Sequence, residues 1–254
     1  MTAAPRPLAA GAARAGATAR RVLLQLRHDP RTVALLLVVP CLLLALLSWI
    51  YDGSPQVFDR IGAPLLGVFP FTVMFLVTSV ATLRERSSGT LERLLSMPLG
   101  RLDLLLGYAL AFGGLAVLQA GLATALAVGL LGLDVAGPLW ALLLVAVLNA
   151  VLGTSVGLFT SAFARTEFQA VQFLPAVVLP QFLLCGLFVP RGQMQPVLGA
   201  VSDVLPLSYA VDAMTEVTVH ADLGGAFVRD TSVTAGCIAA ALALGAATLR
   251  RRTP

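Results

Sequence analysis

Long uncharged stretches dominate the pattern of hydrophobic and polar positions along the chain. Six runs without Asp, Glu, Lys, Arg or His cover residues 32–51, 61–83, 104–133, 135–164, 168–190 and 231–249. A helix of about 20 mostly apolar residues is long enough to cross a bilayer. The runs lack the alternation of apolar and polar residues that is typical of membrane β-barrel strands. The pattern therefore predicts an all-α integral membrane protein with six transmembrane helices.

Composition supports this class. Apolar residues make up 58% of the chain and charged residues only 12%, whereas a soluble domain carries roughly 25% charged residues. We therefore expect residues 18–254 to form a single membrane domain. Residues 1–17, which are rich in Ala and Gly, predict a disordered tail. Residues 18–29 predict an amphipathic helix in the headgroup layer, with Val22, Leu23 and Leu26 on one face.

The basic residues are all arginine, and they sort between alternate connecting segments. If the N-terminus is cytoplasmic, fourteen of the seventeen arginines fall on the inside, as the positive-inside rule requires. Both termini and the loop 84–103 are then cytoplasmic, and the segment 191–230 is extracellular and predicted to hold short helices. The pI of about 9.5 thus reflects membrane topology and not nucleic-acid binding. Arginine in place of lysine, with abundant Ala, Gly and Leu, indicates a GC-rich bacterial genome and therefore the bacterial plasma membrane.

Signatures of catalysis and of metal binding are missing from the sequence. A phosphate-binding P-loop needs a lysine, and the chain has none. Cys41, Cys185 and Cys237 are each isolated in an apolar run, and His28 and His220 are isolated as well, so we expect no metal site, no catalytic residue and no bound cofactor. The uncharged spans also disfavour proton coupling. Work that costs energy would therefore draw on a sodium gradient or on a separate ATPase.

Neutral polar residues interrupt several of the runs. Hydrogen bonding between helices is their simplest role. The alternative is that some of them line a substrate path, and the candidates for that path are Asn149, Thr154, Ser155, Gln172 and Gln181.

Small residues and prolines indicate how the spans pack. Gly153 and Gly157 form a GxxxG motif, which predicts close contact between two helices. Pro175 and Pro180 predict two bends in the fifth span.

One charged segment stands apart from the uncharged pattern. It reads RERSSGTLERLLSMPLGR over residues 84–101 and lies between the second and third runs. Residues 88–90 are suited to capping a helix, and Leu91, Leu94 and Leu95 follow helical spacing. A solvated loop that holds the topology is the simpler interpretation. These signals favour the alternative, a short amphipathic helix held by packing against a neighbour.

Two carboxylates of this segment differ in their local setting. Glu85 lies at the C-terminal end of the second run, where a negative charge opposes the helix dipole, and Arg84 and Arg86 are its simplest counter-ions. Glu92 falls in the first turn of the short helix, where a carboxylate is favoured. Glu85 is therefore the stronger functional candidate.

The extended segment RERSSGTLERLLSMPLGRLDLLLGY closely resembles the first cytoplasmic loop of permease subunits of type-2 ATP-binding-cassette exporters, the daunorubicin-resistance-like branch in particular. The stretch RHDPRTVALLLVVP (27–40) is similar to the helix and first span that precede this loop in the family. The stretch LPLSYAVDAM (205–214) is similar to the short extracellular helices before the last span. The resemblance covers almost the whole chain from residue 18 onward.

The resemblance implies a non-enzymatic transport subunit. Two such permeases would form a homodimer or heterodimer, and each would rest on a separate nucleotide-binding subunit that holds ATP and Mg²⁺. The loop would contain a coupling helix that transmits closure of the ATPase to the spans. The residues that match the family's motif are Glu85, Gly89, Thr90, Leu91, Glu92, Arg93 and Leu94. The flanking arginines and the doubled serine depart from the motif and leave the register of the acidic position open.

The predicted function is ATP-driven export of an amphipathic drug-like or lipid-type substrate, which would enter from the membrane. The uncharged spans carry this expectation, because a strongly ionic cargo would leave an unpaired charge in hydrocarbon. Two alternatives stay open: an intramembrane lipid-modifying enzyme and a non-transporting membrane scaffold. It also stays open whether the segment 191–230 is a gate or an external cap.

Overall fold

The computed structural model describes residues 8–87 and 101–248, and within these ranges it contains helices and turns but no strand. The helices follow one another along the chain as α1 (Leu8–Arg27), α2 (Pro30–Ile50), α3 (Pro55–Ser87), α5 (Arg101–Gly129), α6 (Leu139–Ser161), α7 (Glu167–Phe173), the π-helical η1 (Leu174–Val178), α8 (Leu179–Leu184), the short 3₁₀ turn η2 (Arg191–Gln193), α9 (Pro196–Val204), α10 (Pro206–Val219) and α11 (Gly225–Thr248).

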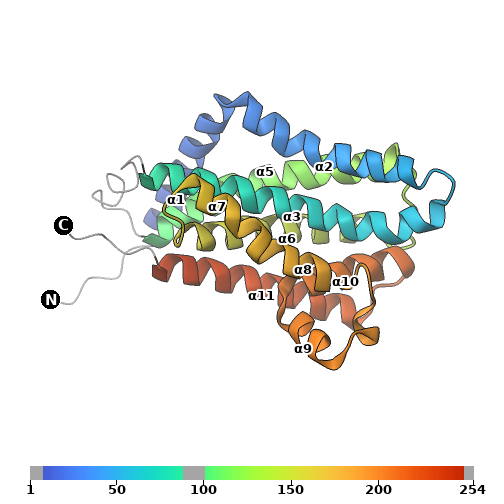
Figure 1. The fold of residues 1–254 in the computed structure, drawn as a ribbon. Coiled ribbons are helices and arrows are strands. Elements are labelled where there is room, and N and C mark those ends of the chain that lie inside the picture. Colours follow the sequence, from blue (N-terminus) through green and yellow to red (C-terminus); the bar gives the residue numbers. More distant parts are fainter. Residues whose placement is uncertain (1–7, 88–100, 249–254) are drawn as a thin grey trace.

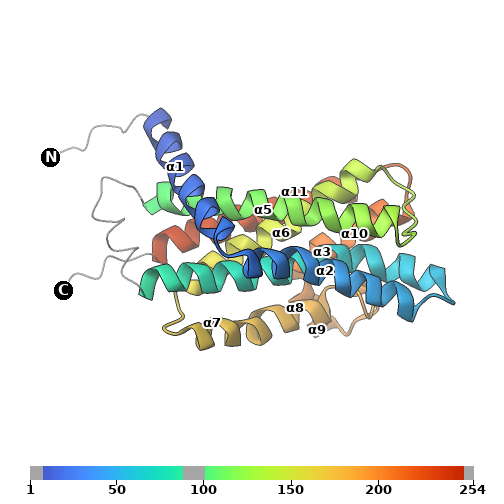
Figure 2. The same cartoon turned by 90° about the horizontal axis from the view of Figure 1, so that it is seen from above.

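Six helical segments of the described chain are long and apolar enough to cross a membrane: α2, α3, α5, α6, the segment from α7 to α8, and α11. They lie side by side and alternate in direction, so the start of α1 and the end of α11 lie at the same end of the bundle (Figure 1). The prediction of six spans is confirmed. We call this end the α1 end, because α1 lies across it (Figure 2), and we call the opposite end the far end.

The first helix begins earlier than the sequence predicts. Helix α1 starts at Leu8, so the expectation of a disordered tail over residues 1–17 is wrong for residues 8–17. Alanine, which is abundant there, is the strongest helix former. The helix is also held by packing, since Ala15 is only 3% exposed.

Several helical spans are shorter than the uncharged runs that predict them, because residues at one end of the run form a turn. Helix α5 ends at Gly129, and Gly132 then adopts a φ of +71°, a conformation that favours glycine. Helix α6 begins only after Pro138. In the fifth span, the two prolines accompany the π-helical turn η1 and the start of α8, and π-helical turns are a recognised cause of bending in a helix.

Helices α3 and α6 approach each other closely, as the GxxxG motif predicts. A Cβ added to Gly153 would lie 2.2 Å from the carbonyl oxygen of Phe71, and one added to Gly157 would lie 2.6 Å from that of Phe75. Only glycine leaves room for such an approach of two backbones. The two helices therefore form the tightly packed centre of the bundle.

Helices lie within the segment 191–230, as the sequence predicts. Helices α9 and α10 meet at an angle of 91°, and both lie well away from the α1 end, with α9 below the middle of the bundle (Figure 1). The side of the membrane on which they lie stays a prediction.

Candidate functional site

Helix α1 is seated on α5 at a glycine. A Cβ added to Gly107 would lie 2.4 Å from Cβ of Thr18 and 2.9 Å from the carbonyl oxygen of Ala15. No side chain fits between two helices at that separation. Gly107 therefore fixes where α1 crosses α5.

Two ion pairs flank this crossing. The Arg14 Nε donates to Asp103 Oδ2 at 2.8 Å, in the first turn of α5. The Arg21 Nη2 donates to Glu85 Oε2 at 3.0 Å and to the hydroxyl of Tyr108 at 3.2 Å. Arg21 therefore joins the last turns of α3 to the first turns of α5.

The segment that carries most of the predicted coupling motif lies outside the described residues. This applies to Gly89, Thr90, Leu91, Glu92, Arg93 and Leu94, and it applies to the predicted short helix. The structure does describe both stems of the segment, the end of α3 and the start of α5. Both stems are bound to α1 by the contacts of Arg14 and Arg21.

Glu85, the remaining member of the motif, has a counter-ion that the sequence did not suggest. Its charge is compensated by Arg21 of α1, from 64 residues away in the chain. Arg84, the next residue, forms a two-pronged contact with Glu167 at the start of α7, with distances of 2.9 and 3.0 Å. The end of α3 is therefore tied to α1 on one side and to α7 on another.

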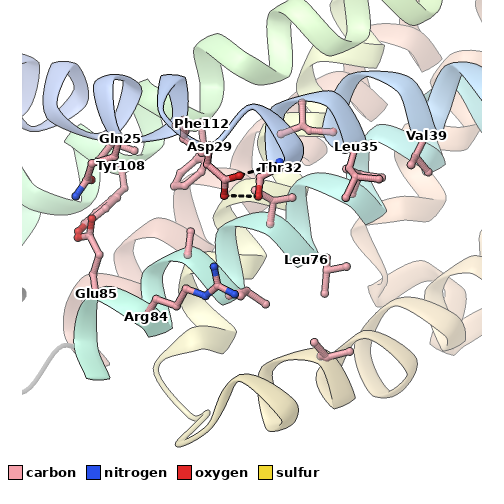
Figure 3. A pocket seen from close by; sticks show the side chains of 18 residues that line it. Gln25, Asp29, Thr32, Leu35, Val39, Leu76, Arg84, Glu85, Tyr108 and Phe112 are labelled. Atoms are coloured by element: carbon pink, nitrogen blue, oxygen red, sulfur yellow. Dashed lines mark hydrogen bonds between the residues drawn. The ribbon is translucent and has the colours of Figure 1, made fainter. Parts of the chain in front are cut away.

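A cavity of about 540 Å³ opens beside this junction. Its wall is apolar and comes mainly from α2 and α3, with Val171 of α7 closing one side. Polar side chains gather at its α1 end (Figure 3), namely Gln25, Asp29, Thr32, Arg84, Glu85 and Tyr108. Small-molecule sites generally combine an apolar lining with a few polar groups. The cavity thus suits a molecule that has a polar head and an apolar body.

Asp29 keeps its charge at the polar end of the cavity. It caps α2, and its carboxylate accepts hydrogen bonds from the Thr32 hydroxyl at 2.6 Å and from the Thr32 amide at 3.2 Å. These bonds favour the ionised form and lower the pKa of Asp29 below its usual range. The carboxylate is therefore negative at neutral pH.

Asn149 and Gln181, two of the predicted path residues, are buried. Asn149 on α6 faces α3, where a Cβ added to Gly67 would lie 2.3 Å from Asn149 Nδ2. Among the described residues, neither amide atom of Asn149 has a hydrogen-bond partner. Gln181 donates to the carbonyl oxygen of Val177 at 3.0 Å, within its own helical segment.

The other three path candidates lie elsewhere. Thr154 and Ser155 are buried, and their hydroxyls donate to the carbonyl oxygens of Ala150 and Val151, one turn earlier in α6. Gln172 is exposed on α7. The structure therefore does not gather these candidates in one place, and none of them lines the 540 Å³ cavity. Their role in a substrate path stays a prediction.

Among the polar groups of the cavity, sequence reasoning singled out Glu85 and its neighbour Arg84 but missed Gln25, Asp29, Thr32 and Tyr108. Gln25 and Asp29 lie outside the uncharged runs, and Tyr108 looks like a packing residue. One signal was available. Arg14 and Arg21 are seven residues apart and share one side of a helix, which becomes apparent once the helix is extended back to Leu8. Asp103, in the first turn of the third span, α5, was the matching acidic position.

Comparisons with known proteins agree with this architecture. The sequence profile of the family described as "ABC-2 type transporter" matches residues 15–219. The "Probable multidrug ABC transporter permease YbhS" of Escherichia coli (strain K12) is 31% identical over 140 residues, which are 55% of this chain and 37% of that protein. The "Linearmycin resistance permease protein LnrN" of Bacillus subtilis (strain 168) is 26% identical over 162 residues, 63% of this chain and 40% of that protein. The matches thus span less than half of the length of these relatives.

Proposed function

The chain belongs to the ABC-2 type transporter family, and from that premise we propose that it is the permease subunit of an ATP-driven exporter of amphipathic drug-like or lipid-type molecules. The observation that carries the proposed cargo is the cavity at the α1 end, with its apolar wall and polar head region. The names of the two relatives, a probable multidrug permease and a linearmycin resistance permease, support the same class of cargo.

The energy would come from a separate subunit. Because the chain has no lysine for a P-loop, ATP and Mg²⁺ would be held by a partner ATPase, and a second permease would complete the pore. The proposed site is the bacterial plasma membrane, with the N-terminus in the cytoplasm. The α1 end then faces the ATPase. Closure of the ATPase would push on residues 88–100, and the push would reach α3, α5 and α1 together, because Arg21 contacts both stems.

The cargo proposal is tested by filling the cavity. Leu76 lines it, whereas Leu118 on α5 is 55% exposed and is not among its lining residues. The chain is reconstituted in liposomes with the ATPase from a neighbouring gene, and ATP-dependent movement of a fluorescent cationic, neutral or anionic amphiphile is measured. Leu76→Trp should lower transport because the larger side chain takes up space that the cargo would occupy, and a loss of about 1.4 kcal/mol in cargo binding corresponds to about tenfold, whereas Leu118→Trp should leave transport unchanged.

The possible outcomes separate the alternatives. Assembly with the ATPase without transport of any amphiphile would support the scaffold. Equal transport by both tryptophan variants would refute the cavity as the cargo site.

The partner proposal has its own test. Glu92→Arg combined with Leu94→Asp reverses one charge and places a carboxylate on the predicted apolar face of the coupling helix. The double variant should insert normally but lose co-purification with the ATPase or lose stimulated ATP hydrolysis. Unchanged assembly and hydrolysis would mean that the segment is a solvated loop.

A further inference from the structure

The arginines of α1 fall into two groups. Arg14 and Arg21 turn toward the bundle and pair with carboxylates at 2.8 and 3.0 Å. Arg20 and Arg27 are exposed, and within the described chain no hydrogen bond or ion pair reaches either side chain. Only two of these four arginines thus pair with carboxylates of the described chain.

The unused charge is combined with exposed leucines. Arg20 and Arg27 are seven residues apart and therefore lie on one side of the helix. Leu23 and Leu24, between them in the sequence, are 42% and 39% exposed. The opposite side of the helix packs on the bundle, where Val22 is 4% exposed. The expectation that Leu23 shares a face with Val22 is wrong, because α1 turns a second, outward apolar surface away from α5.

Ordinary helix stability does not account for this outward face. The helix dipole favours Arg27, which lies in the last turn of α1. It does not favour Arg20, which is a full two turns earlier, because the effect is confined to the last turn. Two adjacent exposed leucines also indicate that this face contacts something apolar and not water alone.

The position of α1 indicates what covers this face. Helix α1 runs at an angle across the end of the bundle and leads directly into α2 (Figure 2). Helix α2 is a membrane span whose Leu35 and Val38 are 63% and 56% exposed. Its first turn, with the exposed Arg31, marks the level at which the span leaves the hydrocarbon. Helix α1 therefore lies at the level of the lipid headgroups.

We propose that the outward face of α1, formed by Arg20, Leu23, Leu24 and Arg27, binds anionic phospholipid headgroups. A guanidinium group binds phosphate oxygens with paired hydrogen bonds. Amphipathic helices that combine arginine with leucine lie in the headgroup layer with their apolar side chains at the acyl boundary. The arginines account for the preference for anionic over zwitterionic lipid, and the leucines account for how deeply the helix lies in the headgroup layer. The proposal concerns binding and does not depend on the transported cargo.

The test places a fluorescent reporter on the face itself. The chain has two tryptophans, Trp49 and Trp140, and both are exchanged for phenylalanine while Leu24→Trp is introduced. The full chain is reconstituted in bilayers, and quenching by dibrominated phosphatidylglycerol is compared with quenching by dibrominated phosphatidylcholine. The reporter should be quenched preferentially by phosphatidylglycerol.

The arginines are then removed in this reporter chain. Each arginine near an anionic surface strengthens association by about fivefold, so Arg20→Gln with Arg27→Gln should lower the preference by at least about fivefold. The matched control removes the same charge from two other exposed arginines, Arg60→Gln with Arg165→Gln, and should keep the preference. Lysine at both positions 20 and 27 should keep most of the preference for phosphatidylglycerol, and raised salt should weaken this preference.

Three results would overturn the proposal. The first is equal quenching by both lipids in the reporter chain. The second is an equal loss of preference in the control, which would show that only the net charge matters. The third is an unchanged lipid preference in the Arg20 and Arg27 variant combined with weaker co-purification of the ATPase, which would assign the face to the protein partner.

Discussion

The crossing of α1 over α5 can be tested at Gly107. Changing Gly107 to alanine adds one methyl group, which would lie 2.4 Å from Cβ of Thr18 and 2.9 Å from the carbonyl oxygen of Ala15. Part of this clash is with backbone, so the two helices must separate. Overfilling a packed contact costs about 1–3 kcal/mol. The same substitution also favours the α5 helix by about 1 kcal/mol through intrinsic propensity.

A matched control on the same helix removes the propensity effect. Gly114 has no atom within 4 Å of an added Cβ, so Gly114→Ala gains the propensity without a clash. The difference between the two variants is therefore the cost of the clash, about 1–3 kcal/mol. A difference of that size changes the equilibrium for lifting α1 off α5 by about fivefold to 150-fold.

Hydrogen exchange measures this equilibrium directly. The backbone amides of α1 are followed by mass spectrometry in lipid nanodiscs for both variants. Exchange in α1 should be at least about fivefold faster in Gly107→Ala than in Gly114→Ala, with α6 unchanged, because opening of a local unit controls its exchange. Equal protection of α1 in the two variants would refute the close crossing and, with it, the idea that α1 is fixed to the stems of residues 88–100.

Three further predictions concern the helix ends and the centre of the bundle. Arg21→Glu or Glu85→Arg alone should uncouple ATP hydrolysis from transport, since each leaves like charges in contact, and the double exchange should restore coupling in part. Asp29→Ala should fray the start of α2, whereas Asp29→Asn should not, because asparagine also caps a helix. The pKa of Asp29 is lowered, so the stabilising contribution of its ionised form is present at neutral pH and is lost as the pH falls through that lowered pKa. The amide signal of Thr32 in NMR spectra would report both effects. Gly153→Ala should prevent correct packing of α3 on α6 and lower the yield of monodisperse protein, whereas Gly121→Ala, with no atom within 4 Å, should not.

The spans were predictable from the sequence because each one carries its own signal. A run of uncharged apolar residues has only one stable arrangement across a bilayer, so the six spans of the structure follow the six runs. Helix α1 had no such signal. The alanines of its first half favour a helix but the glycines among them do not, and the contacts that hold it, Thr18 with Gly107 and Arg14 with Asp103, join residues 89 apart in sequence. Such contacts cannot be inferred from local pattern.

The candidate site divides in the same way. Glu85 was recognisable because a carboxylate at a helix C-terminus conflicts with the dipole. Its counter-ion could not be identified from the sequence, since Arg21 comes close to Glu85 only when α1 packs on the bundle. Asn149 was recognisable as a polar residue in an apolar run. That it would face Gly67, and that neither of its amide atoms would find a partner among residues 8–87 and 101–248, depends on how α3 and α6 pack.

The burial of the spans indicates which walls of the cavity can move. In the most apolar part of each span, 61% of the residues of α3 and of α6 are buried, against 17% for α2 and for the segment from α7 to α8. Helix α3 is held to α6 through the glycines and to α1 and α5 through Arg21, so these four helices form one connected unit at the α1 end. Helix α2 contains Pro40, and the segment from α7 to α8 contains a π-helical turn, both of which are places where a helix bends. Helix α3 also contains two prolines, Pro64 and Pro70, but its close packing on α6 holds it in place. If access to the cavity between α2, α3 and Val171 changes, we expect α2 and α7 to move relative to α3.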